Sequence, residues 1–246
     1  MVRKDEITEK IRNGAYGFGT ESPDREGLRQ DLEEAGMNFS NAELPGACLR
    51  RAPLDEIDFS NALLVGAEFD EASLVEAKFE GANLAGASFK EALLANSFFR
   101  DADLSEAKFN DAELDGAHLF FANFTKASFI DANLMGADFE GSTLKGAVFH
   151  GAELEKANFK GADLRDADLR GAQLWGAHMV GTNLEGAIIA EDQMLALAVA
   201  TGQVKIADAK KVSAEELRQL LEERGVKIEK ATIPVEEKKL VPQKLR

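Results

Sequence analysis

A five-residue period is the feature of this sequence that most constrains its fold. Every fifth residue from 39 to 189 is large and apolar, and we call these residues centres. The residue two places before each centre is almost always small, as it is throughout residues 81–89, Gly-Ala-Asn-Leu-Ala-Gly-Ala-Ser-Phe. A period of five fits neither the helical period of 3.6 nor the strand period of 2. The chain must therefore turn a corner once every five residues, so that the centre and the small residue both face inward.

Positions 20 residues apart form columns of like residues, which indicates that four such turns close one coil. The column 39–179 is Phe except for Leu119 and a final Met, and the column 44–184 is Leu except for Phe124. The column 49–189 is mostly Phe and the column 54–174 is Leu throughout. Two opposite faces thus carry Phe and two carry Leu. At a strand spacing of about 4.8 Å per coil, the coils make a four-sided rod roughly 37 Å long.

Leu119 and Phe124 exchange places between two neighbouring columns. They are consecutive centres of the same coil, so the exchange keeps the core volume of that coil constant. Close-packed interiors tolerate changes that conserve volume. We therefore expect both side chains to lie in one layer of a shared core.

The repeat resembles the pentapeptide repeat family, whose Ala-(Asp/Asn)-(Leu/Phe) pattern stands at residues 82–84, 132–134 and 162–164. The likeness covers residues 37–191 without a break in register. It implies an all-β solenoid, a right-handed quadrilateral β-helix of nearly eight coils. A few residues break the pattern at the small position, and we expect wider packing at the largest mid-solenoid one, Ile57. These residues are Met37, Ile57, Ser97, Ser142 and Thr182.

Residues 1–36 precede the repeat and are expected to form a helical N-terminal cap, since a bare terminal coil would expose unpaired backbone. A pair of isoleucines at i, i+4 predicts a helix over residues 5–13. A pair of leucines predicts a second helix, with Ser22 as its N-cap, that ends near residue 35. The glycine-rich residues 14–20 follow no strand and lack a suitably placed lysine, so we do not expect a phosphate-binding loop there.

Residues 192–230 leave the repeat and predict a small α or α/β extension. The apolar run 193–201 predicts a helix that plugs the open end of the solenoid or pairs with a second copy. The residues proposed for capping or for a homodimer are Met194, Leu195, Leu197, Val199 and Trp175.

The remaining part of the extension combines one predicted helix with two predicted strands. Ser213 begins a capping box for a helix that ends near Arg224. Short strands are expected at 204–206 and 226–228. Residues 231–246 are rich in charge and proline, and we expect a flexible tail.

The net charge of −15 lies mostly on the repeat. Residues 37–191 carry 12 basic and 26 acidic side chains. Direct binding to nucleic acid is not expected, because phosphate neutralisation supplies most of that affinity. The sequence has neither a secretory signal nor an apolar run long enough to span a membrane, so we expect a cytoplasmic protein without membrane contact.

No group of residues predicts catalysis, a cofactor or a metal site. The histidines closest in register, His118 and His178, are three coils apart, about 14 Å at the strand spacing. A regular rod has no cleft in which an acid and a base could converge on a substrate. We therefore expect no enzymatic activity and no cofactor.

Outward aromatic residues are the strongest candidate for a binding site. The 20-residue stacking rule brings one group together from two coils of one face: Phe98, Arg100, His118, Phe120 and Phe121. Aromatic residues and Arg are enriched among the residues that dominate binding energy. We expect a scaffold that presents the acidic faces of a rigid rod to a protein partner. Packing of these rings under a terminal segment is the alternative.

A thinner apolar set lies on the face of the column 54–174 and comprises Leu93, Met135 and Trp175. We expect Trp175 to pack under the helix of residues 193–201.

The family resemblance implies a second function. Some pentapeptide repeat proteins imitate the size and charge of duplex DNA, bind DNA gyrase and give fluoroquinolone resistance. The acidity of this chain agrees with that function. The unbroken register and the C-terminal extension differ from the interrupting loops and C-terminal dimer helices common in that group.

Overall fold

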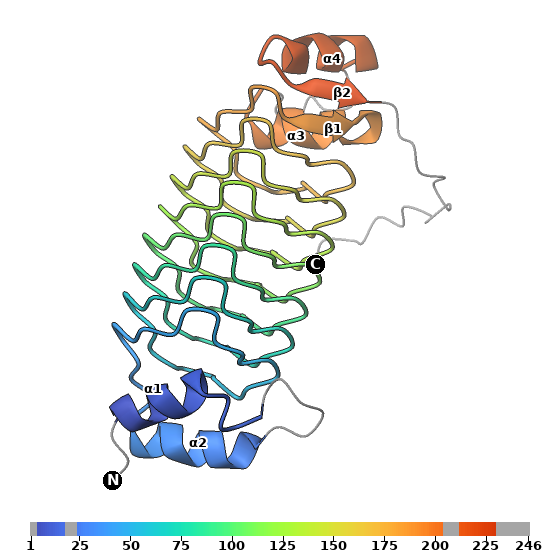
Figure 1. Ribbon diagram of the computed structural model, residues 1–246. Coiled ribbons are helices and arrows are strands. Elements are labelled where there is room, and N and C mark those ends of the chain that lie inside the picture. Colours follow the sequence, from blue (N-terminus) through green and yellow to red (C-terminus); the bar gives the residue numbers. More distant parts are fainter. Residues whose placement is uncertain (1–3, 18–23, 204–211, 230–246) are drawn as a thin grey trace.

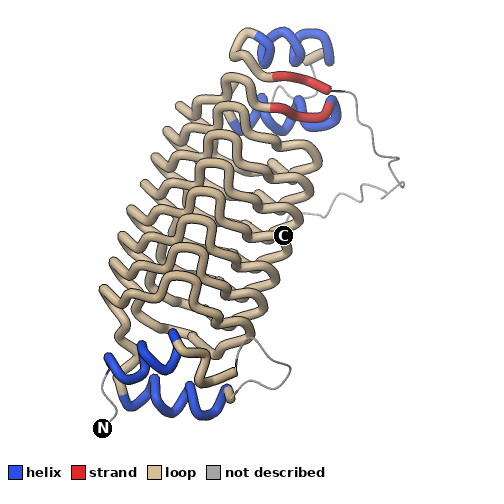
Figure 2. The backbone as a smooth tube through the Cα atoms, in the orientation of Figure 1, coloured by secondary structure: helices blue, strands red, loops and turns tan. Residues whose placement is uncertain are grey.

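The computed structural model describes residues 4–17, 24–203 and 212–229, in which the repeat forms a rod with helices at both ends (Figure 1). Parallel bridges join residues 20 apart, from Asn38 with Asp58 to Asp168 with Ile188. A bridge recurs every five residues, so four belong to each coil and the rod has four faces (Figure 2). We name each face by its first centre: the Phe39, Leu44, Leu49 and Leu54 faces.

The corners between faces have left-handed backbone. Every fifth residue from Asn41 to Gly186, two places after a centre, has φ between 55° and 78°. Glycine adopts this conformation without steric cost, and Asn and Asp tolerate it better than other residues. The corner position explains the regular glycines of the repeat.

The centres form a core of stacked side chains. Phe89 and Phe109 stack with ring centroids 4.9 Å apart and planes 1° apart. Rings of neighbouring columns meet edge to face, as Phe79 and Phe89 do at 5.8 Å and 85°. The Phe59 ring lies 6.1 and 5.6 Å from its two neighbours in the same column, so spacing is wider next to Ile57, as expected.

The exchanged centres lie in one layer of this core. Leu119 and Phe124 are both fully buried. The Phe124 ring lies 5.5 Å from the rings of Phe129 and Phe139. Phe124 therefore fills space between the two Phe columns in the coil where one of them has a leucine.

Polar residues at the small inward position are satisfied by backbone carbonyls. The Ser97 hydroxyl donates to the Leu94 carbonyl at 2.7 Å, and the Ser142 hydroxyl donates to the Leu119 carbonyl at 2.6 Å. Thr182 makes the equivalent bond 2.8 Å long. These departures from the repeat therefore leave no hydroxyl unpaired in the core.

Two helices cover the N-terminal end of the rod, α1 (Lys4–Arg12) and α2 (Arg25–Glu34). Their isoleucine and leucine pairs are buried, as the spacing predicts. The prediction of Ser22 as the N-cap is wrong. Asp24 caps α2, because its carboxylate is the group that reaches the free N–H of Gly27, at 2.8 Å, and it places negative charge at the positive end of the helix. Part of the glycine-rich segment, residues 18–20, lies outside the described residues.

At the C-terminal end of the rod, five short elements follow within the described residues. They are β1 (Ile188–Ala190), the 3₁₀ helix η1 (Glu191–Gln193), α3 (Met194–Ala200), α4 (Ala214–Glu222) and β2 (Lys227–Glu229). β2 pairs in parallel with β1, so it lies on the Leu49 face as one further rung. The predicted capping box of α4 is present, with Ser213 N–H donating to Glu216 Oε2 at 2.8 Å. The strand predicted at 204–206 and the flexible tail predicted at 231–246 fall outside the described residues.

Gln193 joins the last coil to α3 through a buried side-chain amide. Its Nε2 donates to the carbonyls of Leu169 and Ala172 at 2.7 and 2.8 Å, and its Oε1 accepts from the Ala190 N–H at 2.8 Å. The side chain thus satisfies three backbone groups where the repeat ends.

Candidate functional site

The predicted aromatic residues form one continuous cluster on the Phe39 face, which we call the aromatic patch. Phe98 and His118 stack at 4.8 Å with planes 9° apart. His118 and Phe120 meet edge to face at 6.2 Å, and Phe120 and Phe121 do so at 5.9 Å. The Arg100 guanidinium lies 5.9 Å from the Phe120 ring. Stacking by 20 residues therefore brings all five side chains together across two coils.

The members of the aromatic patch differ in exposure. Phe98, His118 and Phe120 are half-buried, whereas Phe121 is 57% exposed. Arg100 is exposed and forms an ion pair with Asp101 at 3.1 Å, so its charge is partly offset within the same coil. The exposed surface of the patch is therefore mainly aromatic.

Phe121 occupies a backbone position that does not suit it. It is a left-handed corner with φ 59°, where the other described corners of the rod hold Gly, Asn, Asp, Glu, Lys or Arg. A bulky residue in this conformation is an outlier that costs about 1–2 kcal/mol. Strain of this kind concentrates at functional sites.

Gly141, the next corner of the same column, allows the Phe121 ring to lie flat on the rod. A Cβ at Gly141 would approach Cε1 and Cδ1 of that ring to 2.5 and 2.6 Å, which is closer than atoms can pack. Gly141 is not among the residues predicted for the patch, although the 20-residue stacking rule places it beside Phe121. The glycine is thus part of the surface that forms the patch.

The candidate capping residues lie in the chain's own core. Met194 and Leu197 are buried, and Leu195 and Val199 pack against the same core. The Met179 N–H donates to the Ala200 carbonyl at 2.9 Å, which places α3 across the end of the solenoid. This burial favours capping, and a homodimer through α3 stays a prediction.

The prediction that Trp175 packs under α3 is wrong, because its side chain is 53% exposed. Trp175 follows a centre of the Leu54 face and therefore points outward from the side of the rod. α3 covers the end of the rod rather than this side, since it bonds to Met179 on the Phe39 face.

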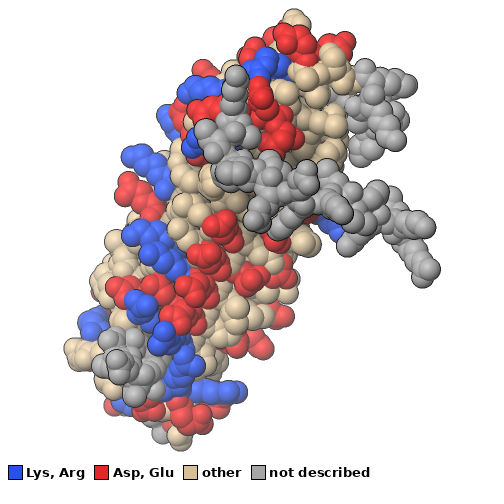
Figure 3. All heavy atoms as spheres, turned by 90° about the vertical axis from the view of Figure 1, so that its right-hand side faces the viewer, with Lys and Arg blue, Asp and Glu red and all other residues tan. Residues whose placement is uncertain are grey.

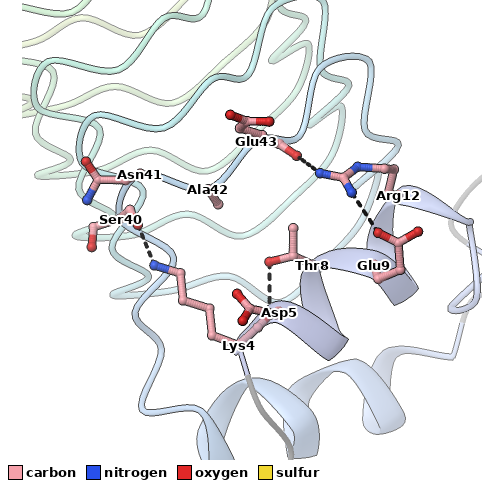
Figure 4. A pocket seen from close by; sticks show the side chains of 9 residues that line it. All are labelled: Lys4, Asp5, Thr8, Glu9, Arg12, Ser40, Asn41, Ala42 and Glu43. Atoms are coloured by element: carbon pink, nitrogen blue, oxygen red, sulfur yellow. Dashed lines mark hydrogen bonds and ion pairs between the residues drawn. The ribbon is translucent and has the colours of Figure 1, made fainter.

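A hollow between α1 and the first coil contains charged side chains (Figure 4). Lys4 Nζ donates to the Ser40 carbonyl. Arg12 donates to Glu9 Oε2 and to the Glu43 carbonyl, both at 2.6 Å. The cations of this hollow are engaged in holding α1 on the coil, which argues for a structural role.

The charged groups under the N-terminal helices also serve the fold. Hydrogen bonds from Lys10 and then Tyr16 hold the pKa of Asp31 below its usual value. Burial, and after it the hydrogen bond to Asp31, raise the pKa of Tyr16. These three side chains join α1, the following turn and α2.

Acidic and basic side chains both lie on the surface of the rod. Figure 3 shows one side of the molecule, on which Asp and Glu side chains run along most of the length, with Lys and Arg beside them. Within the described residues, no group of three or more His, Cys, Asp or Glu is arranged to hold a metal ion. Across the same residues, no helix is long and apolar enough to cross a membrane.

Comparison with solved structures places the rod among known solenoids. The fluoroquinolone resistance protein QnrB1, in its trypsin-treated form, is 21% identical and has a TM-score of 0.57, over 69% of this chain and 85% of that chain. This likeness shows the fold, a right-handed β-helix-like repeat.

Two cyanobacterial pentapeptide repeat proteins are also similar. Rfr23 from Cyanothece 51142 is 38% identical over 35% of this chain and 59% of its own length, with a TM-score of 0.35. HetL from Nostoc sp. strain PCC 7120, involved in regulation of heterocyst differentiation, is 26% identical over 67% of this chain and 80% of its own, with a TM-score of 0.38. A search of curated proteins gives no match.

The family model for pentapeptide repeats matches the chain in 8 copies, over residues 53–90, 82–119, 121–141, 132–171 and 167–191. These segments cover more than half of the sequence and coincide with the coils of the rod. The chain therefore belongs to the pentapeptide repeat family.

Proposed function

We propose that this protein is a non-enzymatic scaffold that presents the acidic faces of a rigid rod to a protein partner, with the aromatic patch as the main contact. The observation that carries the proposal is Phe121, a large exposed ring at a strained corner. Glycine or asparagine at this corner would serve the fold at lower cost. A residue that contributes little to folding and exposes a large apolar surface is what a binding site requires.

The rod itself supports this function by its rigidity. The parallel bridges and stacked rings fix the outward side chains of successive coils at constant spacing. Binding then orders few side chains, which lowers the entropic cost of association. The rings of Phe98, His118 and Phe120 already pack against one another. The surface left for a partner is therefore the exposed edges of these rings and the ring of Phe121.

The test is an affinity capture from the native cell, followed by identification and a direct binding measurement with the purified partner. Phe120→Ala with Phe121→Ala should weaken that binding by at least roughly tenfold, as expected for central aromatic contacts. The matched control is Leu63→Ala with Val65→Ala, which removes outward apolar side chains from the Leu44 face. Equal binding by wild type and both variants would refute a role for the patch.

A second candidate function is the imitation of DNA toward gyrase that the family resemblance implies. It is supported by the fold likeness to QnrB1 and by the net charge of −15. Purified protein should then inhibit supercoiling by DNA gyrase at micromolar concentration or below. Supercoiling that is unaffected at high micromolar concentration would exclude this function and leave the first proposal standing.

A further inference from the structure

The Leu54 face is the most acidic of the four faces. Counting the outward residues beside each centre and at each corner, it carries seven carboxylates and one lysine, a net charge of −6, while the other faces carry −2, −3 and −3. Its charged residues are Asp55, Glu56, Glu76, Glu113, Asp115, Glu153, Glu155 and Lys156.

The carboxylates of the Leu54 face are not neutralised by the rod. Among the residues that the structure describes, none of the seven forms an ion pair, whereas each other face contains such pairs. Examples are Arg51 with Glu71 at 2.7 Å and Lys160 with Glu140 at 3.0 Å. Carboxylates in adjacent coils repel each other, so a cationic segment would be attracted to this face.

The same face exposes three large apolar side chains. Leu93, Met135 and Trp175 are 47%, 42% and 53% exposed. They stand along the rod from its middle to its C-terminal end, among the acidic residues. A ligand that matches this face needs both positive charge and apolar side chains.

The described chain ends beside this face. β2 is parallel to β1 on the Leu49 face, and Glu229, its last residue, accepts from Arg170 Nη1 at 2.8 Å. In each coil of the rod, the chain turns from the Leu49 face to the Leu54 face directly after the position that Glu229 occupies in β2. The direction of β2 therefore carries the chain from Glu229 toward the edge of the Leu54 face.

The 17 residues that follow Glu229 have the composition that the face requires. Residues 230–246 contain five cations and two glutamates, a net charge of +3, together with Ile233, Val235, Leu240, Val241 and Leu245. Fully extended, they reach at most about 56–61 Å, more than the length of the rod. A segment tethered so close to its site has an effective concentration on the order of millimolar.

We propose that residues 230–246 dock on the Leu54 face of their own chain, with their cations against its carboxylates and their apolar side chains against Leu93, Met135 and Trp175. This inference does not rest on the proposed partner function: the main contact proposed there, the aromatic patch, lies on the Phe39 face, and the docked segment leaves that face and the two other acidic faces open to a partner.

Trp175 reports on this docking directly, since it is the only tryptophan of the chain. The experiment measures its emission maximum and its quenching by acrylamide in the full-length protein. A variant with Lys238, Lys239, Lys244 and Arg246 changed to Glu should release the segment. Trp175 emission should then move to longer wavelength, and its quenching constant should rise roughly twofold. Salt at about 1 M, where the screening length is about 3 Å, should give a similar change in the wild type.

A second pair of variants locates the site. Glu153→Gln with Glu155→Gln, one coil below Trp175, should also increase quenching, whereas Glu106→Gln with Asp166→Asn on the opposite face should not. Melting temperatures are compared to show that each variant stays folded. Identical Trp175 emission and quenching in the wild type and the charge-reversed tail variant would overturn the proposal. Quenching that depends on protein concentration would overturn docking within one chain, because it would mean exchange of segments between copies.

Discussion

Phe121→Asn should change the free energy of unfolding by about 1 kcal/mol or less, although it removes a large aromatic ring. Phe121 is 57% exposed, so roughly 90 Å² of a phenylalanine surface of about 200 Å² is buried. At about 25 cal/mol per Å², that burial contributes about 2 kcal/mol. Asn is better suited to the left-handed corner and recovers about 1 kcal/mol of strain, and it keeps part of the buried surface.

The assay is urea denaturation followed by far-ultraviolet circular dichroism, with Phe109→Ala as the reference for a core ring. Phe109 is fully buried between two stacked rings, and its removal should cost about 3–5 kcal/mol. A loss of about 3 kcal/mol or more for Phe121→Asn would equal that of a buried core ring such as Phe109 and would show that Phe121 belongs to the core. Phe121 would then serve the fold and not binding.

Three further substitutions test the ends of the rod and the surface of the patch. Gln193→Leu leaves the Ala190 N–H and the Ala172 carbonyl unpaired, whereas the Leu169 carbonyl keeps its bond from the Ala172 N–H. It should lower the free energy of unfolding by about 2 kcal/mol or more in a denaturation curve, and a smaller loss would contradict the bonding described. Asp31 has a lowered pKa, so its contribution to stability is present above its unfolded pKa and is lost as pH falls through its folded pKa. The difference in melting temperature between wild type and Asp31→Asn should therefore become smaller below about pH 4. A difference that stays constant with pH would contradict a stabilising role of the Asp31 carboxylate. Gly141→Ala should destabilise more than Gly161→Ala in the same column, because only the first displaces the Phe121 ring; equal losses would show that the ring moves freely.

The architecture of the rod could be predicted from the sequence because each inward position repeats one packing requirement. A single phenylalanine would indicate little, but columns of Phe and Leu sorted onto alternate faces are compatible with few coil shapes. The exchange of Leu119 and Phe124 could also be predicted to lie in one core layer, because the two residues belong to the same coil and the exchange keeps the volume of that layer constant. The structure agrees at each of these positions.

The corner geometry also leaves a signal in the sequence. Glycine recurs two places after the centres, at positions such as Gly81 and Gly86, which indicates a left-handed residue there. With that rule, Phe121 stands out as a residue that breaks it. The stacking rule placed Phe121 in the patch, while the backbone strain became visible only in the structure.

The ends of the chain were less predictable because they do not repeat. The helices followed from pairs of apolar residues at i, i+4, yet both Ser22 and Asp24 are good N-cap residue types, and the spacing of the apolar residues does not say which of them begins the helix. The position of Trp175 near the C-terminal end predicts contact with α3, which the structure does not show. The exposure of Trp175 depends on which side of the rod α3 covers, and the position of α3 cannot be predicted from the five-residue repeat.

The central structural claim is that the centres of one coil fill a common core layer, and the coupling between Leu119 and Phe124 tests it most directly. Leu119→Phe alone should overpack the coil and cost about 1–3 kcal/mol. Phe124→Leu alone should cost about 2 kcal/mol, because it removes ring contacts at 5.5–6.2 Å.

The double variant restores the usual column pattern and should lie within about 1 kcal/mol of the wild type, a coupling of about 2 kcal/mol or more. Leu119→Phe combined with Phe59→Leu, three coils away, should show additive losses instead. The decisive measurement is the free energy of unfolding of the 119/124 double variant. A value near the wild type supports the account, and a loss equal to the sum of the two single losses would contradict it.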